Sequence, residues 1–325
     1  MAASLVDADR RGVHTHGLLR LPSYCAEARS GRVVVDAEPT VEQEHGPTAV
    51  VDGHGAFGAV TGTVSMDEAV ARAEIHGVGF VTARGCNHFG AAAFYSRRAV
   101  ERGMVGIVAT STPAVMAPWG GAEARIGNNP LSIAAPVPEG CAPFVLDLAQ
   151  SAVSRGRIKL AELSGESIPD GWALAADGSP TTDPVAALAG TLLPFGGYKG
   201  YGLALAIEVL TGVLAGADLG PELINASLTG AASSGSATRL GTVGSLYVAV
   251  DPERFVGRKV FAERMGRLVA LMKATPPAAG FTEVVVPGEL EERSARIAQE
   301  AGIALDQRTV ALLTDLGVAE SVPFL

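Results

Sequence analysis

The stretch SMDEAVARAEIHGVGFVTARGCNHFGAAAFYSRRAVERGMVGIVATS, residues 65–111, decides the fold class. Its first part is typical of a helix that begins with Ser65 as N-cap and Glu68 three residues later, and that ends at Gly77. VGFVTAR follows as a short buried strand, and then come a second helix that ends at Gly103 and a second strand, MVGIVATS. This helix–strand alternation predicts an α/β layered domain whose sheet is at least partly parallel.

Further helices and strands are predicted on both sides of that stretch. Residues 1–10 are typical of the end of a helix, and 197–216 and 290–302 predict two more helices, the first with a glycine-rich start. The remaining predicted strands are PLSIAAPV at 130–137, PFVLDLA at 143–149, SLYVAVDP at 245–252 and TEVVVPG at 282–288. Polar stretches at 165–184 and 227–244 are the expected discontinuities.

The composition excludes several classes of protein. The 325 residues are 48% hydrophobic and 18% charged, and 34 acidic residues against 25 basic ones give a net charge of −9, which argues against a nucleic-acid or anionic-membrane surface. The three cysteines, Cys25, Cys86 and Cys141, are odd in number and far apart, as in reduced cytosolic proteins. We find neither a signal peptide nor a membrane span, and expect a cytoplasmic protein.

Gly53, Gly55 and Gly58 form the glycine pattern of a dinucleotide-binding loop within VVDGHGAFGAVTG, residues 50–62. Such a loop needs a second strand that ends in an acidic residue. Here that strand ends in Arg84, which could at most contact a 2′-phosphate. We therefore interpret the match as a coincidence of spacing and expect a loop that precedes the helix.

The segment HTHGLLRLPSY, residues 14–24, concentrates polar side chains that could bind a ligand. His14 and His16 could form an H-x-H metal pair, but a metal site needs further ligands and no acidic cluster lies near them in the sequence. Arg20 suits a carboxylate, because its planar guanidinium donates two parallel hydrogen bonds. The sequence therefore favours a carboxylate site over a metal site.

The segment RGCNHFGAAAF, residues 84–94, places His88 between a strand and a helix, where α/β enzymes often carry catalytic groups. A histidine there can accept and donate a proton near neutral pH. The alternative is a structural histidine that caps the helix or bonds to backbone. Cys86 lies two positions earlier, but no residue in the sequence would activate its thiol, and we interpret it as a packed side chain.

The segment PFGGYKGYGLALAIE, residues 194–208, offers a seat for phosphate groups of a type other than the Walker loop. Gly196, Gly197 and Gly200 let the backbone approach a ligand closely, and Lys199 adds a positive charge at the start of a long helix. The segments IGNNPLSIAAP and PFVLDLAQSAVSRGRI also carry polar groups at strand ends, although Gly and Asn-Pro are equally typical of plain turns.

Together these segments resemble the malate/L-lactate dehydrogenase family of the second type, which includes malate, sulfolactate and ureidoglycolate dehydrogenases and piperideine-2-carboxylate reductases. The family's motifs match in order and spacing over essentially the whole chain, as ADRRGVHTHGLLRLPSY, CNHFGAAAFY, PWGGAEARIGNNPLSIAAP, LDLAQSAVSRGRI, YKGYGLAL and a late PGE. The resemblance implies a three-layer α/β/α fold, not a Rossmann fold. It also implies NAD or NADP as cofactor, no metal and a homodimer.

The same resemblance assigns roles to individual residues. His88 would be the general acid/base at the C2 oxygen or nitrogen of the substrate, and Arg20 would hold its carboxylate, with Thr15, His16 and Tyr24 beside it. The residues implied to line the cofactor are Asn129, Asp147, Leu148, Ala149, Lys199 and Gly200. The expected substrate is a 2-hydroxy or 2-oxo acid of the malate, lactate, sulfolactate or ureidoglycolate type, or a cyclic 2-imino acid. Residues 51–245 would form the central cofactor-binding region, and 1–50 and 245–325 would pack on it as substrate-side and terminal segments.

Four positions depart from the family pattern: Thr15 and Cys86 replace serines, Asn128 replaces a threonine, and Tyr198 replaces a histidine. The family also carries a helical segment ahead of the ADxRG motif, and we expect this chain to be less stable than a version extended upstream. One alternative is therefore a catalytically impaired dinucleotide-binding protein. A metal-dependent hydrolase built on His14 and His16 is the other.

Overall fold

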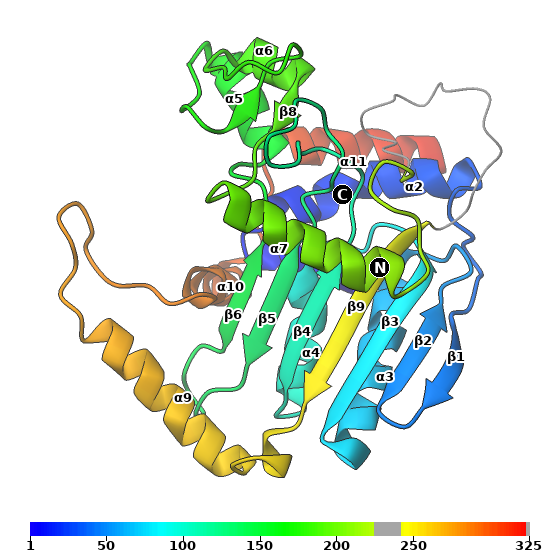
Figure 1. Ribbon diagram of the computed structural model, residues 1–325, viewed down its shortest axis with the longest axis vertical. Coiled ribbons are helices and arrows are strands. Elements are labelled where there is room, and N and C mark those ends of the chain that lie inside the picture. The colour runs from blue at the N-terminus through cyan, green and yellow to red at the C-terminus, as the bar shows by residue number, and fades with distance from the viewer. Residues whose placement is uncertain (224–241, 323–325) are drawn as a thin grey trace.

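The computed structural model describes residues 1–223 and 242–322. Its centre is a seven-stranded sheet in the order β1-β2-β3-β9-β4-β5-β6 (Figure 1). The strands are β1 Thr40–His45, β2 Thr48–Asp52, β3 Val78–Cys86, β4 Val105–Thr110, β5 Leu131–Ala135, β6 Phe144–Leu148 and β9 Val243–Val250. β2 and β3 are parallel, and β9 lies between β3 and β4 and antiparallel to both. The partly parallel sheet expected from the sequence is confirmed.

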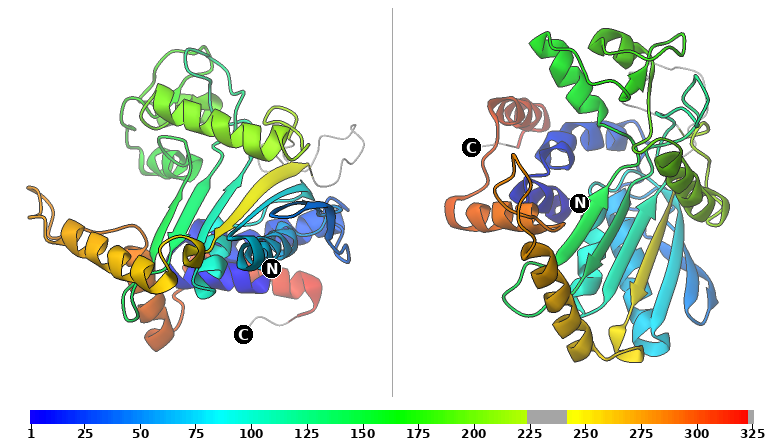
Figure 2. Two further views of the ribbon diagram at one scale, coloured as in Figure 1. Left: turned by 60° about the horizontal axis from the view of Figure 1, so that its bottom comes forward. Right: turned by 60° about the vertical axis from the view of Figure 1, so that its left-hand side comes forward.

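Helices cover both faces of this sheet and make three layers (Figures 1 and 2). α3 and α4 pack on one face, whereas α7 crosses the other and continues into a π-helical turn, Val209–Val213, against β9. The helices are α1 Ala2–Arg10, α2 Leu21–Arg29, α3 Gly58–His76, α4 Ala92–Glu101, α5 Arg155–Ser164, α6 Pro184–Ala189, α7 Tyr198–Glu208, α9 Arg258–Lys273, α10 Glu289–Ala301 and α11 Gln307–Glu320. The α/β/α fold class is confirmed.

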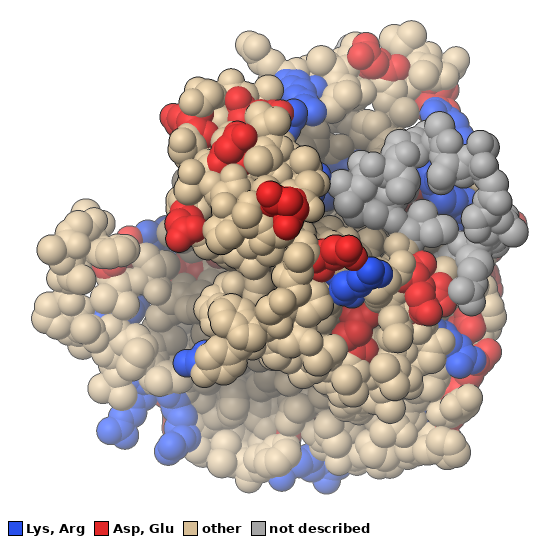
Figure 3. Space-filling view, turned by 45° about the horizontal axis from the view of Figure 1, so that its top comes forward, with Lys and Arg blue, Asp and Glu red and all other residues tan. Residues whose placement is uncertain are grey.

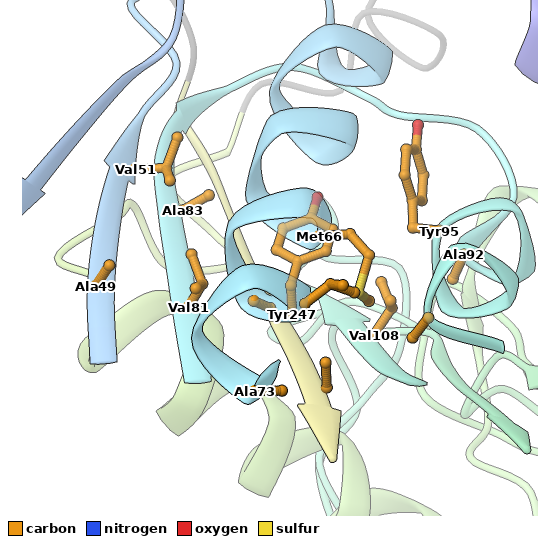
Figure 4. Packing of buried hydrophobic residues seen from close by; sticks show 14 of the residues in the cluster. Ala49, Val51, Met66, Ala73, Val81, Ala83, Ala92, Tyr95, Val108 and Tyr247 are labelled. Atoms are coloured by element: carbon orange, nitrogen blue, oxygen red, sulfur yellow. The ribbon is translucent and has the colours of Figure 1, made fainter. Parts of the chain in front are cut away.

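The main core lies between the sheet and the two helices α3 and α4. Met66 of α3 lies over Tyr247 of β9, with Val81 and Val108 from the flanking strands on either side (Figure 4). All four side chains are almost fully buried. Such burial of apolar surface is the main favourable term in folding, and it orients the ends of β3 and β4.

The start of α3 differs from the prediction. Ser65 is not an N-cap: it lies inside the helix, and its hydroxyl donates to the Thr61 carbonyl. The helix begins at Gly58, where a Cβ would lie 2.2 Å from the carbonyl oxygen of Asn87. Tertiary contact with the 85–88 loop therefore extends the helix by two turns over a sequence that is a poor helix start by itself.

The predicted strand at 282–288 is wrong, since the structure has no regular strand there. This segment makes a backbone hydrogen bond to β6 through Val145 N and Pro287 O, 3.0 Å apart. Proline has no N–H to donate and Gly288 follows with a φ of +95°, so pairing with the edge strand does not continue.

A smaller subdomain lies beyond the edge of the sheet at which β5 begins and β6 ends. It contains α5, α6 and a two-stranded sheet of β7, Ala173–Leu174, and β8, Thr191–Leu192, around its own buried cluster that includes Ile158 and Ile168. The predicted discontinuity at 165–184 lies within it, and most of the one at 227–244 lies outside the described residues.

The terminal segments contribute helices and strands to both the edge and the centre of the molecule. α11 contacts α2 and the 3₁₀ turn before it, and α1 contacts α4 and α10. α9 extends from the body and has no fully buried residue (Figure 1). β1, part of β2 and most of β9 fall outside the predicted central region 51–245, whose boundaries stay a prediction. In the described part of the chain, no helix has the length and apolar character needed to cross a bilayer.

Candidate active site

Three segments far apart in the sequence bring His88, Tyr24 and His16 together. His88 lies in the loop between β3 and α4, Tyr24 is on α2, and His16 ends the 3₁₀ turn His14–His16. The Tyr24 hydroxyl is 2.7 Å from His88 Nδ1. The His16 ring stacks on the His88 ring, with centroids 5.9 Å apart and planes at 17°. The structure therefore joins three residues that the sequence predicted for one site.

The loop that carries His88 is fixed by its neighbours on both sides. Asn87 Nδ2 donates to the carbonyl oxygens of Gly55 and Ala56 at 2.8 and 2.9 Å. Phe89 is buried in the core and accepts a hydrogen bond at its carbonyl from Tyr95. The glycine pattern at 53–58 thus packs against the histidine loop. Sequence reasoning missed Asn87 as a support, although the NHFG motif was the available signal.

The surroundings of the two histidines favour their neutral forms. Burial, followed by the positive charge of Arg20, lowers the pKa of His88 to about 3 and that of His16 to about 4. His88 nevertheless keeps an exposed surface. Both observations fit a ring that is surrounded by protein but has one side open to a ligand. At neutral pH His88 is therefore uncharged, with one nitrogen protonated and the other a proton acceptor.

The Tyr24 hydroxyl can serve either tautomer of His88. Burial raises the pKa of Tyr24 to about 12, so its oxygen keeps its proton at neutral pH. When the hydroxyl donates to Nδ1, Nε2 carries the ring proton and can give it away. When Nδ1–H donates to the tyrosine oxygen, Nε2 has the lone pair of a base. One contact thus supports proton transfer in either direction.

A buried carboxylate holds the 14–18 turn. The Asp9 side chain is 2% exposed, and it accepts hydrogen bonds from His14 Nδ1 at 2.9 Å and from Leu18 N at 2.7 Å. A Cβ on Gly17 would lie 2.1 Å from Asp9 Oδ1, so the carboxylate fits only because that residue is glycine. Sequence reasoning missed Asp9; the signal was an acid in the ADRRG motif just ahead of this turn.

Arg20 keeps most of its guanidinium free for a ligand. Its Nε donates to the Thr15 carbonyl at 2.9 Å. Across residues 1–223 and 242–322 the structure gives Arg20 no ion pair, yet its charge lowers the pKa of both His16 and His88. Thr15 is exposed, and its Oγ1 is 3.0 Å from His16 Nδ1. A half-buried cation without an acidic partner can bind the carboxylate of a small acid.

The H-x-H pair does not form a metal centre in the part of the chain that the structure describes. His14 bonds to Asp9 while His16 stacks on His88. No group of three or more potential metal ligands converges in the two described ranges.

Two residues predicted to line the cofactor begin α7. Lys199 is exposed and Gly200 is buried, where a Cβ would lie 2.1 Å from the Phe195 carbonyl oxygen. Gly196 and Gly197 have φ of +57° and +66°, which favours glycine at the turn into the helix. The first turn of a helix leaves N–H groups without intrahelical partners, and these together with a lysine can bind phosphate.

The end of β6 connects the histidine loop with the start of α7. Asp147 Oδ2 accepts from Ala93 N, in the first turn of α4, at 2.8 Å. Burial raises the pKa of this partly exposed carboxyl to about 6. Three residues on, the Gln150 carbonyl accepts from Phe195 N at 3.0 Å. The Leu148 and Ala149 side chains are half-buried between these two contacts.

The side chain of Asn129, which was expected to line the cofactor, has a structural role. It is fully buried, with φ of +20°, and its Nδ2 donates to Glu208 Oε2 at 2.6 Å and to the Ala204 carbonyl at 3.0 Å. Its Oδ1 accepts from Thr112 N at 3.0 Å. The side chain joins the 126–130 turn to α7, so only its backbone could face a ligand, and its place beside the cofactor stays a prediction.

Gln150 has an unusual environment next to that turn. Its backbone N–H donates to the Asn128 carbonyl at 2.8 Å, but both polar atoms of its fully buried side chain lack a partner in the described structure. Buried amides are normally hydrogen-bonded. An orphaned amide at the junction of the 126–130, 147–150 and 194–200 segments fits a place built to receive a polar ligand.

The sequence profile of the malate/L-lactate dehydrogenase family matches residues 1–314. The chain belongs to this family. L-sulfolactate dehydrogenase of Methanocaldococcus jannaschii is 38% identical over 311 residues, which cover 96% of this chain and 87% of that protein. The solved structure of sulfolactate dehydrogenase from that organism has a TM-score of 0.88 at 37% identity and covers 99% of this chain and 90% of the other.

Other relatives differ in the cofactor that their names give. The (2R)-3-sulfolactate dehydrogenase (NADP(+)) of Chromohalobacter salexigens is 42% identical over 256 residues, or 78% of this chain and 74% of that protein. Ureidoglycolate dehydrogenase (NAD(+)) of Escherichia coli is 33% identical over 305 residues, or 94% and 84%. This malate/L-lactate dehydrogenase family member is thus an NAD(P)-dependent dehydrogenase of 2-hydroxy acids.

Proposed function

We propose that this dehydrogenase interconverts a small 2-hydroxy acid and its 2-oxo acid, or reduces a cyclic 2-imino acid, with His88 as general acid/base and Arg20 as carboxylate anchor. The observation that carries the proposal is the 2.7 Å contact between Tyr24 Oη and His88 Nδ1 beside the unpaired Arg20. It supports a neutral histidine whose Nδ1 is held by Tyr24 and whose pKa is lowered, after burial, by the charge of the proposed carboxylate-binding Arg20.

His88 would move the proton at the C2 oxygen. In oxidation its neutral Nε2 accepts the hydroxyl proton of the substrate, and in reduction the other tautomer donates a proton to the carbonyl oxygen. NAD or NADP, when bound, takes up or supplies the hydride at C2. Tyr24 keeps Nδ1 hydrogen-bonded in both directions, so the ring need not turn during the step.

Arg20, Thr15 and His16 would position the substrate. Two N–H groups of Arg20 bind the two oxygens of the carboxylate, which fixes the orientation of C2 relative to His88. The neutral ring of His16 stacks on the ring of His88 and limits the rotation of that ring. The low pKa of both histidines follows first from burial and then from the positive charge of Arg20, which would also attract the substrate.

The residues at the start of α7 and at the end of β6 fit a dinucleotide. Gly196, Gly197 and Gly200 leave the backbone free of side chains, so that a ligand can approach it closely. Lys199 supplies a cation, and the buried side-chain amide of Gln150 lacks a hydrogen-bond partner in the described structure. Asp147, Leu148, Ala149 and the Asn129 turn complete the proposed seat. Lys199 would hold the phosphate groups as a point charge.

We further propose a cytoplasmic homodimer. The half-exposed apolar side chains of α9 make this helix a suitable contact for a second copy of the chain. All three cysteines are free thiols, which supports a reducing compartment. Figure 3 shows acidic side chains spread over one face and basic ones in small groups, with no continuous basic area in its described part, so this face does not suit nucleic acid.

The test follows the absorbance of the reduced nicotinamide. NADH and NADPH are offered separately with oxaloacetate, pyruvate, sulfopyruvate and a cyclic imine, and the hydroxy acids are assayed in reverse. We expect His88→Gln to lose turnover by roughly 100-fold or more, while His76→Gln, an exposed residue at the end of α3, stays active.

Two other results would count against the proposal. A His88→Gln variant with parental rates would exclude His88 as the acid/base. Cofactor binding without turnover on any substrate would favour a catalytically impaired dinucleotide-binding protein instead.

A further inference from the structure

Two large aromatic side chains are exposed together beside the start of α7. Trp119 is 60% exposed and Tyr198 is 61% exposed. Their rings meet edge to face, with centroids 6.3 Å apart and planes at 67°. In that arrangement a ring face remains open to solvent. Single exposed apolar residues are normal on a protein surface, whereas contiguous exposed apolar groups often mark a binding site.

The backbone beneath this pair is shaped to accommodate it. A Cβ on Gly197 would lie 3.0 Å from the Trp119 ring, so the indole lies directly against the turn into α7. Tyr198 is the first residue of α7, and Lys199 follows it. Tyr198 replaces the histidine of the family motif, and Trp119 fills the variable position of the PxGG motif, so neither aromatic is prescribed by the motifs.

The residues between the end of β6 and the start of α7 indicate where each part of a dinucleotide would bind. Asp147 contacts the first turn of α4, next to the loop of His88, where the nicotinamide end must be for hydride transfer at C2. Gln150 lies two residues past the end of β6, and its carbonyl accepts a hydrogen bond from Phe195 N, just ahead of α7. The phosphate groups then reach the Lys199 end of the helix. The adenosine follows the phosphate groups in the dinucleotide, and the aromatic pair lies next to Lys199 at this end of α7.

We propose that Trp119 and Tyr198 form an adenine-binding shelf on which the adenine ring of NAD or NADP stacks. The inference rests on the proposed function, because it takes the dinucleotide as the ligand. A purine has a flat π-face, and stacking on an aromatic side chain contributes to binding without requiring hydrogen bonds to the base. The orphaned amide of Gln150 and the cation of Lys199 mark the polar part of the same path.

The two tryptophans of the chain make a direct test possible. In a Trp172→Phe background, Trp119 is the sole tryptophan and reports on its own environment. Trp172 is a half-buried residue of the small subdomain that packs on Arg157. We expect NADH, ADP-ribose and AMP to quench Trp119 emission, and nicotinamide mononucleotide not to do so.

Binding measured by calorimetry supplies the second readout. We expect Trp119→Ala and Tyr198→Ala each to weaken NADH binding roughly tenfold, with Tyr198→Phe close to the parent. Phe281→Ala, which removes an aromatic that is 73% exposed elsewhere, should bind as the parent does. Because the affected side chains are exposed, the variants should remain folded, and circular dichroism checks this.

Each contrary result identifies what failed. Equal binding by the parent and by both alanine variants would overturn the adenine-binding shelf and leave the proposed function intact. Quenching by nicotinamide mononucleotide but not by AMP would also overturn it. Trp119 emission that changes with protein concentration in the absence of nucleotide would show that a second copy covers the pair. No binding of NADH or NADPH by the parent would overturn the inference together with its premise.

Discussion

The hydrogen bond between Tyr24 and His88 links two residues 64 positions apart, and it decides which nitrogen of the histidine can meet a substrate. A tyrosine whose pKa is raised to about 12 keeps its proton over the whole working range of an enzyme. It can donate to or accept from Nδ1, so the neutral histidine is kept in one orientation in both reaction directions. We therefore propose Tyr24 as a positioning residue for His88.

Removing the Tyr24 hydroxyl should reduce the rate of the proton-transfer step. We expect Tyr24→Phe to lower kcat by roughly tenfold while KM for the acid changes little, because the proposed carboxylate anchor, Arg20, is unchanged. Steady-state kinetics at several pH values measures this. Ser30→Ala, which removes an exposed hydroxyl at the end of α2, is the matched control. A raised KM with unchanged kcat would instead indicate that Tyr24 contacts the substrate.

The low pKa values of His16 and His88 make stability depend on pH. In the unfolded chain both would titrate near 6.5, whereas in the folded protein their pKa values are about 4 and about 3. The unfolded state thus binds more protons below about pH 6.5, and the free energy of unfolding should fall as the pH is lowered through that window. The carboxyl of Asp147, with its pKa raised to about 6, works in the opposite direction.

Urea unfolding at about pH 7.5 and about pH 5 should show this difference. We expect the double variant His16→Gln, His88→Gln to lose less stability between the two pH values than the parent does. An identical loss in both proteins would mean that other groups account for the acid sensitivity.

Among the structural elements, the two central helix–sheet contacts depend on glycines in the strands. A Cβ on Gly79 of β3 would lie 1.9 Å from the Ala69 carbonyl oxygen of α3. A Cβ on Gly106 of β4 would lie 2.2 Å from the Ser96 carbonyl oxygen of α4. In each case the helix backbone rests on the strand. This close packing sets the position of the loop between β3 and α4, and with it His88.

Gly79→Ala should therefore destabilise the protein by about 3 kcal/mol, because the collision is with backbone, which cannot rotate away. Gly156→Ala in α5 is the matched control: nothing lies within 4 Å of its Cβ position. We expect that control to gain up to about 1 kcal/mol from better helix propensity. Thermal unfolding of the three proteins compares them, and a Gly79→Ala variant as stable as the parent would contradict the close contact.

At the scale of the whole molecule, α9 has little support from its own chain. None of its residues is fully buried, and Leu268, Leu271 and Met272 are about half exposed, at 49%, 56% and 46%. A helix of 16 residues with an apolar face costs free energy in water unless something covers that face. A second copy of the chain would do so.

We expect the protein to sediment as a dimer, and Leu268→Glu with Leu271→Glu to shift it towards monomer. Both positions are exposed in a single chain, so the substitutions should leave the fold of each protomer unchanged, which circular dichroism verifies. Glu263→Gln, an exposed change on the same helix, serves as the control. Parent protein that sediments as a monomer would refute the homodimer.

The sequence by itself determined the fold class and most of the helices and strands, and it predicted the residues from which the candidate site is built. These features are carried by local patterns, such as hydrophobic periodicity, glycine stops and short motifs, that act over a few residues. The start of α3, the position of β9 between β3 and β4, and the absence of a strand at 282–288 were decided only by the tertiary structure. The same holds for the contact between Tyr24 and His88 and for the support from Asp9 and Asn87. The reason is physical: strand order, close backbone approach and buried hydrogen bonds depend on surfaces that are far apart in the chain, and no local propensity specifies which of them meet.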